Sequence, residues 1–176
     1  MTNLVHSLGL ELPVFDEKTR VVNFASYDST LEGTEPTFIR RIALDYAGYY
    51  GTDNLRGVLK RTDEVLEDVA EHCGALVVPH TWGLKKAREQ YQVSDLLPRG
   101  HYLVAEVDRV ISAGGPMPLG ALQLLSLYAN SVARETGTSG YVWDDFGPHQ
   151  FMYGTTHDNP RDTLYLVDIE PMITKV

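Results

Sequence analysis

The sequence predicts an α+β fold, in which strands and helices form separate runs along the chain. Three strand-like segments precede one long amphipathic helix, and two more strands follow that helix. A segment rich in Gly and Pro, SAGGPMP, then interrupts the chain at residues 112–118. Because Gly and Pro break regular structure, we expect two parts, residues 1–111 and 118–176, joined by a hinge at 112–117.

Five runs of apolar residues predict the strands before the hinge. ELPVF and TRVVNFAS lie within residues 11–26, on either side of the polar turn DEKT. The other three are TFIRRIAL at 37–44, ALVVPHTWGL at 75–84 and HYLVAEVDRV at 101–110. Pro79 has no N–H to donate to a neighbouring strand, so the fourth run is expected to lie at an edge or to end near Pro79.

A helix over residues 54–73 is predicted by its periodicity. Its core-facing residues recur at steps of three and four, which places them on one stripe. Asp53 is suited to cap the start of this helix and Gly74 its end. The stripe consists of Leu55, Val58, Leu59, Thr62, Val65, Leu66, Val69, Ala70 and Cys73.

The second part is predicted to contain one helix and a β-hairpin. The helix spans residues 118–136, with Pro118 in its first turn. The strands QFMYG and TLYLVDIE are joined by the turn-forming loop TTHDNPRD at 155–162. Before them lies WDDFGPHQ, where two adjacent carboxylates, Asp144 and Asp145, precede a Gly-Pro turn.

Composition excludes several classes of function. The net charge of −9 argues against binding to nucleic-acid phosphates, which requires clustered cations. No window approaches the ~20 apolar residues needed to span a membrane, and the N-terminus does not resemble a signal peptide. Cys73 is the single cysteine, so no intrachain disulfide can form. We therefore expect a cytoplasmic protein that binds neither nucleic acid nor membranes.

Two acids and an amide carry a resemblance to the protein-kinase-like superfamily. Gln150 follows Asp145 by five positions, with Pro148 between them, and a hairpin then leads to Asp168 in YLVDIEP. This order is similar to the family's D-x-x-x-x-N loop followed by its DFG-type motif. It looks most like the small atypical kinases and the aminoglycoside-phosphotransferase-like enzymes.

The resemblance implies a two-lobed kinase-like fold, truncated after the DFG-equivalent motif. Residues 1–111 would form an N-lobe with a five-stranded antiparallel sheet and the helix 54–73. Residues 118–176 would form a minimal C-lobe of one helix and the hairpin. A protein partner or a second copy of the chain would complete this C-lobe.

The resemblance also implies an ATP-dependent phosphotransferase that uses Mg²⁺. Asp145 would be the catalytic base, and Gln150, Asp168 and Glu170 would be metal ligands. These roles are chemically consistent, since phosphoryl transfer needs positioning and charge neutralisation, and Mg²⁺ prefers oxygen ligands. Alternation along the strand also places Asp168 and Glu170 on the same side.

The nucleotide site implied by the family includes a phosphate-binding cation, a helix acid and the strand before the hinge. Arg40 and Arg41 are the candidate cations, and alternation places them on opposite faces of their strand. Glu67 is the preferred acidic partner on the helix. Glu106 and Val107 would lie beside the nucleotide.

Other interpretations stay open at this stage. The turn DEKT lacks the family's glycines, and the third strand offers Arg in place of Lys, which favours a pseudokinase-like regulatory module that binds a protein partner. Asp145 could instead lie in a solvated loop, and Asp168 could simply end a strand. A metal-dependent hydrolase would require His149 and His157 to converge.

Overall fold

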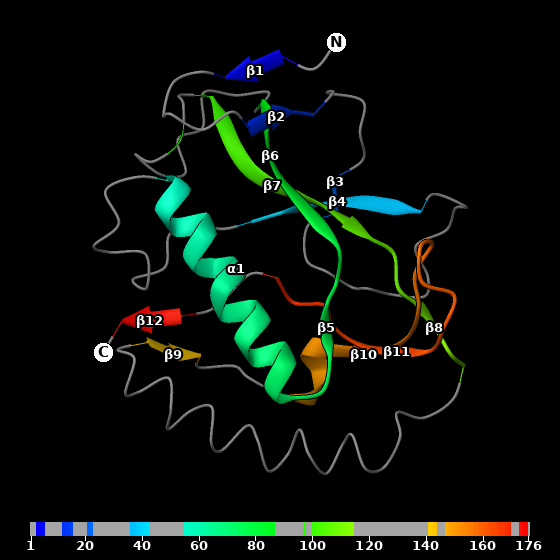
Figure 1. Cartoon of the computed structure of the whole chain (residues 1–176). Helices are drawn as coiled ribbons and strands as arrows, with labels where there is room; N and C mark the ends of the chain where they lie inside the picture. The colour runs from blue at the N-terminus through cyan, green and yellow to red at the C-terminus, as the bar shows by residue number, and fades with distance from the viewer. Residues whose placement is uncertain are drawn as a thin grey trace.

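The computed structural model describes residues 3–5, 12–15, 21–22, 36–42, 55–86, 97, 100–114, 141–143, 147–169 and 173–175. Within these residues the protein is α+β, as predicted, with one α-helix and twelve strands in three sheets (Figure 1). This part of the chain has no helix that is both long and apolar enough to cross a membrane.

The largest sheet contains six strands in the order β1-β2-β6-β7-β4-β3. Its central strands β6, β7 and β4 are antiparallel, whereas β2 joins β6 and β3 joins β4 in parallel. The strands are β1 (Asn3–Val5), β2 (Leu12–Val14), β3 (Val21–Val22), β4 (Thr37–Arg41), β6 (His80–Lys86) and β7 (His101–Asp108).

The prediction of a five-stranded antiparallel sheet is therefore wrong in its strand count and in its edges. The strands on either side of DEKT do not pair with each other, because β2 lies next to β6 and β3 lies next to β4. DEKT lacks the Gly or Asn that a tight hairpin turn requires, which is consistent with this separation. At the edges, β1 pairs with β2 and β3 pairs with β4, whereas β2 reaches the sheet through the distant strand β6.

The second sheet has four strands in the order β5-β11-β10-β8, and it contains the predicted hairpin. β10 (Phe151–Thr155) and β11 (Thr163–Leu166) pair antiparallel, with β5 (Leu76–Val77) and β8 (Ile111–Ser112) at the edges. The expected hinge thus begins as a strand paired with β10, and its residues 115–117 lie outside the described part. A third sheet pairs β9 (Tyr141–Trp143) with β12 (Ile173–Lys175).

The strand predicted at 75–84 is divided at Val78-Pro79, which confirms the expected break at Pro79. β5 belongs to the second sheet and β6 to the first, so this segment carries the chain from one sheet to the other. The Val78 N–H donates to the Leu166 carbonyl (3.0 Å), and the Pro79 carbonyl accepts from the Asp108 N–H (2.9 Å). These two bonds tie β7 and β11 to the crossing point.

The helix α1 (Leu55–His72) confirms the prediction for 54–73 and ends at Gly74 as expected. Gly74 has φ 64°, a conformation that a Cβ disfavours. Its N–H donates to the Glu71 carbonyl (3.0 Å) and the Ala75 N–H to the Ala70 carbonyl (2.8 Å). This pair of bonds is the Schellman arrangement, which satisfies carbonyls left over at the helix end. The helix predicted at 118–136 lies outside the described residues.

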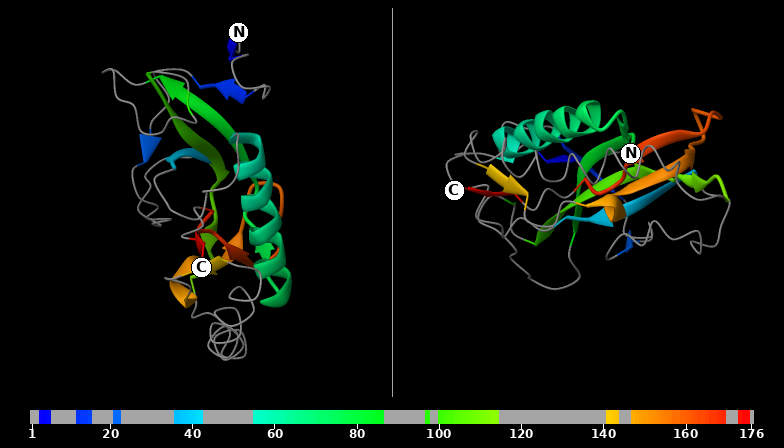
Figure 2. Two further views of the ribbon diagram at one scale, coloured as in Figure 1. Left: turned by 90° about the vertical axis from the view of Figure 1, so that its left-hand side faces the viewer. Right: turned by 90° about the horizontal axis from the view of Figure 1, so that it is seen from below.

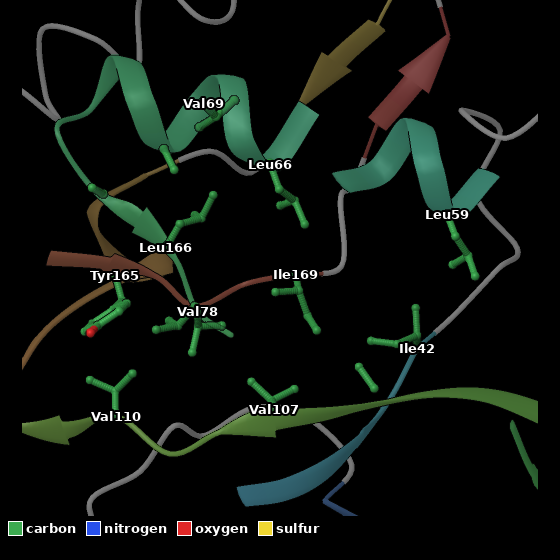
Figure 3. Packing of buried hydrophobic residues seen from close by; sticks show 14 of the residues in the cluster. Ile42, Leu59, Leu66, Val69, Val78, Val107, Val110, Tyr165, Leu166 and Ile169 are labelled. Atoms are coloured by element: carbon green, nitrogen blue, oxygen red, sulfur yellow. The ribbon is translucent and has the colours of Figure 1, made fainter. Parts of the chain in front are cut away.

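One hydrophobic core connects α1 to both large sheets. α1 lies along one side of the strands (Figure 2), and its stripe packs onto them. Leu66 of α1, Ile169 after β11 and Val107 of β7 contribute to the same cluster (Figure 3). Residues before and after the expected hinge therefore share one core, which fixes the hairpin relative to the first sheet.

Candidate functional site

Arg40 and Asp168 form an ion pair between the first sheet and the segment after the hairpin. Arg40 Nη1 lies 2.9 Å from Asp168 Oδ1, and the side chains are 8% and 21% exposed. Because both side chains are largely buried, this ion pair is screened by water less than a surface pair. The structure thus brings together a predicted phosphate-binding cation and a predicted metal ligand that lie far apart in the sequence.

Sheet register explains why Arg40 points toward Asp168. Arg40 and Trp82 both lie opposite Ala105, so the three side chains form a row on one face of the sheet. Trp82 Nε1 donates to Asp63 Oδ1 of α1 (2.9 Å), which identifies this face as the one covered by the helix. Val107 lies on the same face and is fully buried in the core.

Arg41 lies on the opposite face, so only one of the two candidate cations belongs to the site. Its Cζ is 5.3 Å from the centroid of the Tyr102 ring, in a cation–π arrangement. Burial raises the pKa of the Tyr102 hydroxyl, and the charge of Arg41 partly offsets this. The prediction that Arg41 contributes to the nucleotide site is not supported by this position.

Gln150 lies next to Asp168 through backbone hydrogen bonds. It ends the short 3₁₀ helix η2 (Pro148–Gln150), and its carbonyl accepts from the N–H groups of Val167 (2.8 Å) and Asp168 (3.4 Å). The side chain of Gln150 is buried at 2% exposure, and its Oε1 accepts from the Gly147 N–H (3.1 Å). Two predicted metal residues are therefore neighbours, although the amide oxygen of Gln150 is engaged within its own turn.

Two other predicted site residues cannot be placed. Asp145, the predicted base, and Glu170, a predicted metal ligand, both lie outside the described residues. The described residues that flank them are Gly147, at the start of η2, and Ile169, in the core.

Glu67, the acid predicted on the helix, is exposed to solvent on α1. Asp63, one turn earlier, points at the sheet, where its Oδ1 accepts from Trp82 Nε1 and lies 3.2 Å from His80 Nε2. The sequence interpretation did not include Asp63. Its spacing is a usable signal, since Asp63 lies four residues after Leu59 and three before Leu66 and therefore falls on the apolar stripe.

Glu106 and Val107, predicted to lie beside the nucleotide, are residues of the paired strand β7. β7 is paired with β6 on one side and with β4 on the other, so its backbone groups are used within the sheet. The Glu106 side chain lies on the Arg41 face, where its Oε1 accepts from Thr37 Oγ1 (3.0 Å).

The described residues contain no group of three or more His, Cys, Asp or Glu side chains arranged to hold a metal ion. In this part of the chain His149 and His157 do not form the site required by a metal-dependent hydrolase. Asp168 is the one predicted carboxylate ligand that can be placed, and Arg40 neutralises it. Among the described residues, the Asp168 carboxylate and the Gln150 amide could offer oxygen atoms to a cation.

Cys73 is a buried core thiol, as predicted. It packs at the end of the helix stripe, and burial raises its pKa to about 11. Because the thiolate is the reactive form, this environment does not suit a nucleophile.

Comparisons of the chain with protein-family models, with curated proteins and with solved structures found no match. The functional interpretation therefore rests on the geometry around Arg40, Gln150 and Asp168.

Proposed function

We propose that this protein is a kinase-like phosphotransferase that binds ATP and Mg²⁺ at the Arg40–Asp168 pair. The observation that supports the proposal is the 2.9 Å contact between these side chains, which joins a cation from a central strand to an acid after the hairpin. Phosphoryl transfer requires a cation for the phosphates and a carboxylate for the metal at one place. The sequence pattern singled out both residues for these roles.

In this proposal each residue has a defined task. The Arg40 guanidinium binds phosphate oxygens through its fork of N–H donors, and Asp168 supplies a carboxylate oxygen to Mg²⁺. Bound Mg²⁺ would supply positive charge against the phosphates. Asp145 accepts the proton of the substrate hydroxyl, and Glu170 is a second carboxylate for the metal. A protein partner or a second copy of the chain belongs to the same proposal.

The second candidate is a catalytically degenerate, pseudokinase-like module that regulates a protein partner. Two observations favour it. Gln150 Oε1 accepts from the Gly147 N–H, so its use as a metal ligand would compete with this bond. Glu67 is exposed to solvent, so the expected acidic partner is not beside Arg40.

Thermal unfolding with and without Mg²⁺ and ATP tests the proposal. A ligand that binds only the native state raises the melting temperature, and at a hundredfold excess over the dissociation constant it adds about 2.7 kcal/mol. We expect an increase that is lost in Asp168→Asn and kept in Arg41→Gln, whose side chain lies on the opposite face. Absence of any increase at millimolar nucleotide would refute nucleotide binding.

Enzyme assays separate the two candidates. We expect ATP turnover that is lost in Asp145→Asn while the increase in melting temperature persists. Nucleotide binding without turnover in the wild-type protein would instead favour the regulatory module.

A further inference from the structure

His80 lies where the chain crosses from the second sheet to the first, and both of its ring nitrogens face hydrogen-bond acceptors. Nδ1 is 2.9 Å from the Val78 carbonyl oxygen, and Nε2 is 3.2 Å from Asp63 Oδ1 on α1. The His80 side chain is only 12% exposed, so little water reaches the ring. One imidazole therefore contacts the crossing segment on one side and the helix on the other.

A neutral imidazole cannot satisfy both of these contacts. It carries one N–H donor and one lone pair, whereas a carbonyl oxygen and a carboxylate oxygen can only accept. With a single proton on Nδ1, the Nε2 lone pair of His80 would face the Asp63 carboxylate. With a single proton on Nε2, the Nδ1 lone pair would face the Val78 carbonyl. The imidazolium, by contrast, donates to both oxygens.

The surroundings of Asp63 favour placing the second proton on the ring rather than on the carboxylate. Asp63 Oδ1 also accepts from Trp82 Nε1 at 2.9 Å, and a donated hydrogen bond favours the ionised form of a carboxylate. The Asp63 side chain is 40% exposed, so water also solvates its charge. The contact is therefore best satisfied as an ion pair between an imidazolium and a carboxylate.

Asp63 is the one charged side chain that contacts His80 within the described part of the chain. On β7, the residue opposite His80 is Val107, which is apolar. The other charged side chains on the neighbouring elements form ion pairs of their own or lie on the other face of the sheet: Lys60 with Glu64, Arg40 with Asp168, and Glu106 and Asp108.

We propose that His80 is a pH-sensitive latch, which in its doubly protonated form ties α1 to the crossing between the two sheets and which loosens when the ring loses its second proton. The Val78 N–H donates to the Leu166 carbonyl at 3.0 Å, so the segment that His80 contacts also joins the second sheet. Deprotonation turns one of the two ring contacts into a contact between acceptors at this junction. The inference is independent of the ligand site at Arg40 and Asp168.

The latch makes the stability of the fold depend on pH in one direction. Its contribution is complete at acidic pH, where the unfolded chain holds the His80 proton as well. The contribution is lost as the pH rises, until folded His80 also releases the proton. Where the folded state holds one proton more than the unfolded chain, the folding equilibrium constant falls by up to about tenfold per pH unit.

NMR of the histidine ring nitrogens tests the protonation state directly. At about pH 7.5, where a histidine in water is mostly neutral, we expect both ring nitrogens of His80 to be protonated in the wild-type protein. Asp63→Asn keeps an acceptor for Trp82 but removes the negative charge, and we expect His80 to hold one proton there. Asp68→Asn removes the same charge from an exposed position on α1 and should leave His80 doubly protonated.

Urea unfolding from about pH 6 to about pH 9 tests the consequence for the fold. We expect the stability of the wild-type protein to fall more steeply with rising pH than that of His80→Gln, while Asp68→Asn follows wild type. The contribution of Asp108 is common to all of these proteins and cancels in the comparison.

Two NMR results would overturn the latch. One is a single protonated nitrogen on His80 in wild type at about pH 7.5, and the other is a ring that stays doubly protonated in Asp63→Asn. Parallel stability curves for wild type and His80→Gln would also overturn it, because the protonated ring would then not hold the junction. If the variants do not fold, the ring is assigned through the wild-type backbone signals, and its protonation state still decides.

Discussion

At the scale of single residues, a polar side chain on the apolar stripe of α1 joins the helix to the sheet. Asp63 accepts a hydrogen bond from Trp82 and contacts His80, so one carboxylate joins α1 to β6. His80 and Trp82 also pack edge to face, with ring centroids 5.0 Å apart. Asp63 therefore positions α1 over the row of side chains that includes Arg40.

Replacing Asp63 should destabilise the protein. Asp63→Ala leaves the part-buried Trp82 N–H without its acceptor, and we expect the free energy of unfolding to fall by about 1–3 kcal/mol. Urea unfolding followed by tryptophan fluorescence measures this change. Asp68→Ala is the matched control, because Asp68 lies on the same helix but is exposed, and it should change stability by less than about 0.5 kcal/mol. Equal effects of the two substitutions would contradict the role given to Asp63.

The contact between Arg40 and Asp168 depends on strand register, which the sequence alone does not determine. Arg40 and Asp168 were both singled out, but alternation alone could not decide whether Arg40 or Arg41 faces the helix. That choice depends on the register of β4 against β7, where Arg40 lies opposite Ala105. The sequence favours Glu67 over Glu64 because Glu67 lies nearer the flank of the apolar stripe, whereas the role of Asp63 follows only from its contacts with the sheet.

At the scale of elements, the sequence predicted the features that depend on neighbouring residues: the helix, its C-terminal end and the break between two strands. The periodicity of residues 54–73, the C-terminal Gly74 and the break at Pro79 all correspond to observed features. The edges of the large sheet were not predictable in this way. β2 and β3 are only three and two residues long, and they join β6 and β4 in parallel rather than each other, so their positions depend on the assembled sheet.

Asp108, the last residue of β7, should make the free energy of unfolding depend on pH. Burial, followed by the nearby charges of Asp158 and Glu106, raises the pKa of Asp108, and His157 partly offsets this. The folded state therefore binds more protons than the unfolded state in the window from the ordinary value of 3.8 upward to the raised pKa. As the pH rises through that window, the contribution of Asp108 to the free energy of unfolding falls.

Asp108→Asn should remove this fall in the free energy of unfolding with rising pH. We expect the variant to be more stable than wild type at neutral pH, with the difference shrinking as the pH falls below the window. Chemical denaturation at a series of acidic and neutral pH values measures the difference. Asp162→Asn, at an exposed position in the loop between β10 and β11, should follow wild type. A curve for Asp108→Asn parallel to that of wild type would show that Asp108 does not carry the effect.

At the scale of the whole molecule, one core holds the hairpin against the first sheet and its helix. Leu66 of α1, Ile169 after β11 and Val107 of β7 are all buried in it, so Asp168 is positioned by the core residues on either side of it, Val167 and Ile169. The α+β class followed from the order of elements along the chain. The sharing of one core across the expected hinge did not, because it depends on contacts between residues far apart in sequence.

The central claim is that Arg40 and Asp168 form one site, and a double-mutant cycle tests it without any ligand. The free energy of unfolding is measured for wild type, Arg40→Gln, Asp168→Asn and the double variant. We predict a coupling of about 1–3 kcal/mol between the two positions, since each single substitution leaves a poorly solvated charge that the double substitution removes. Substitutions that add to within about 0.5 kcal/mol would contradict the contact, and the proposed function with it.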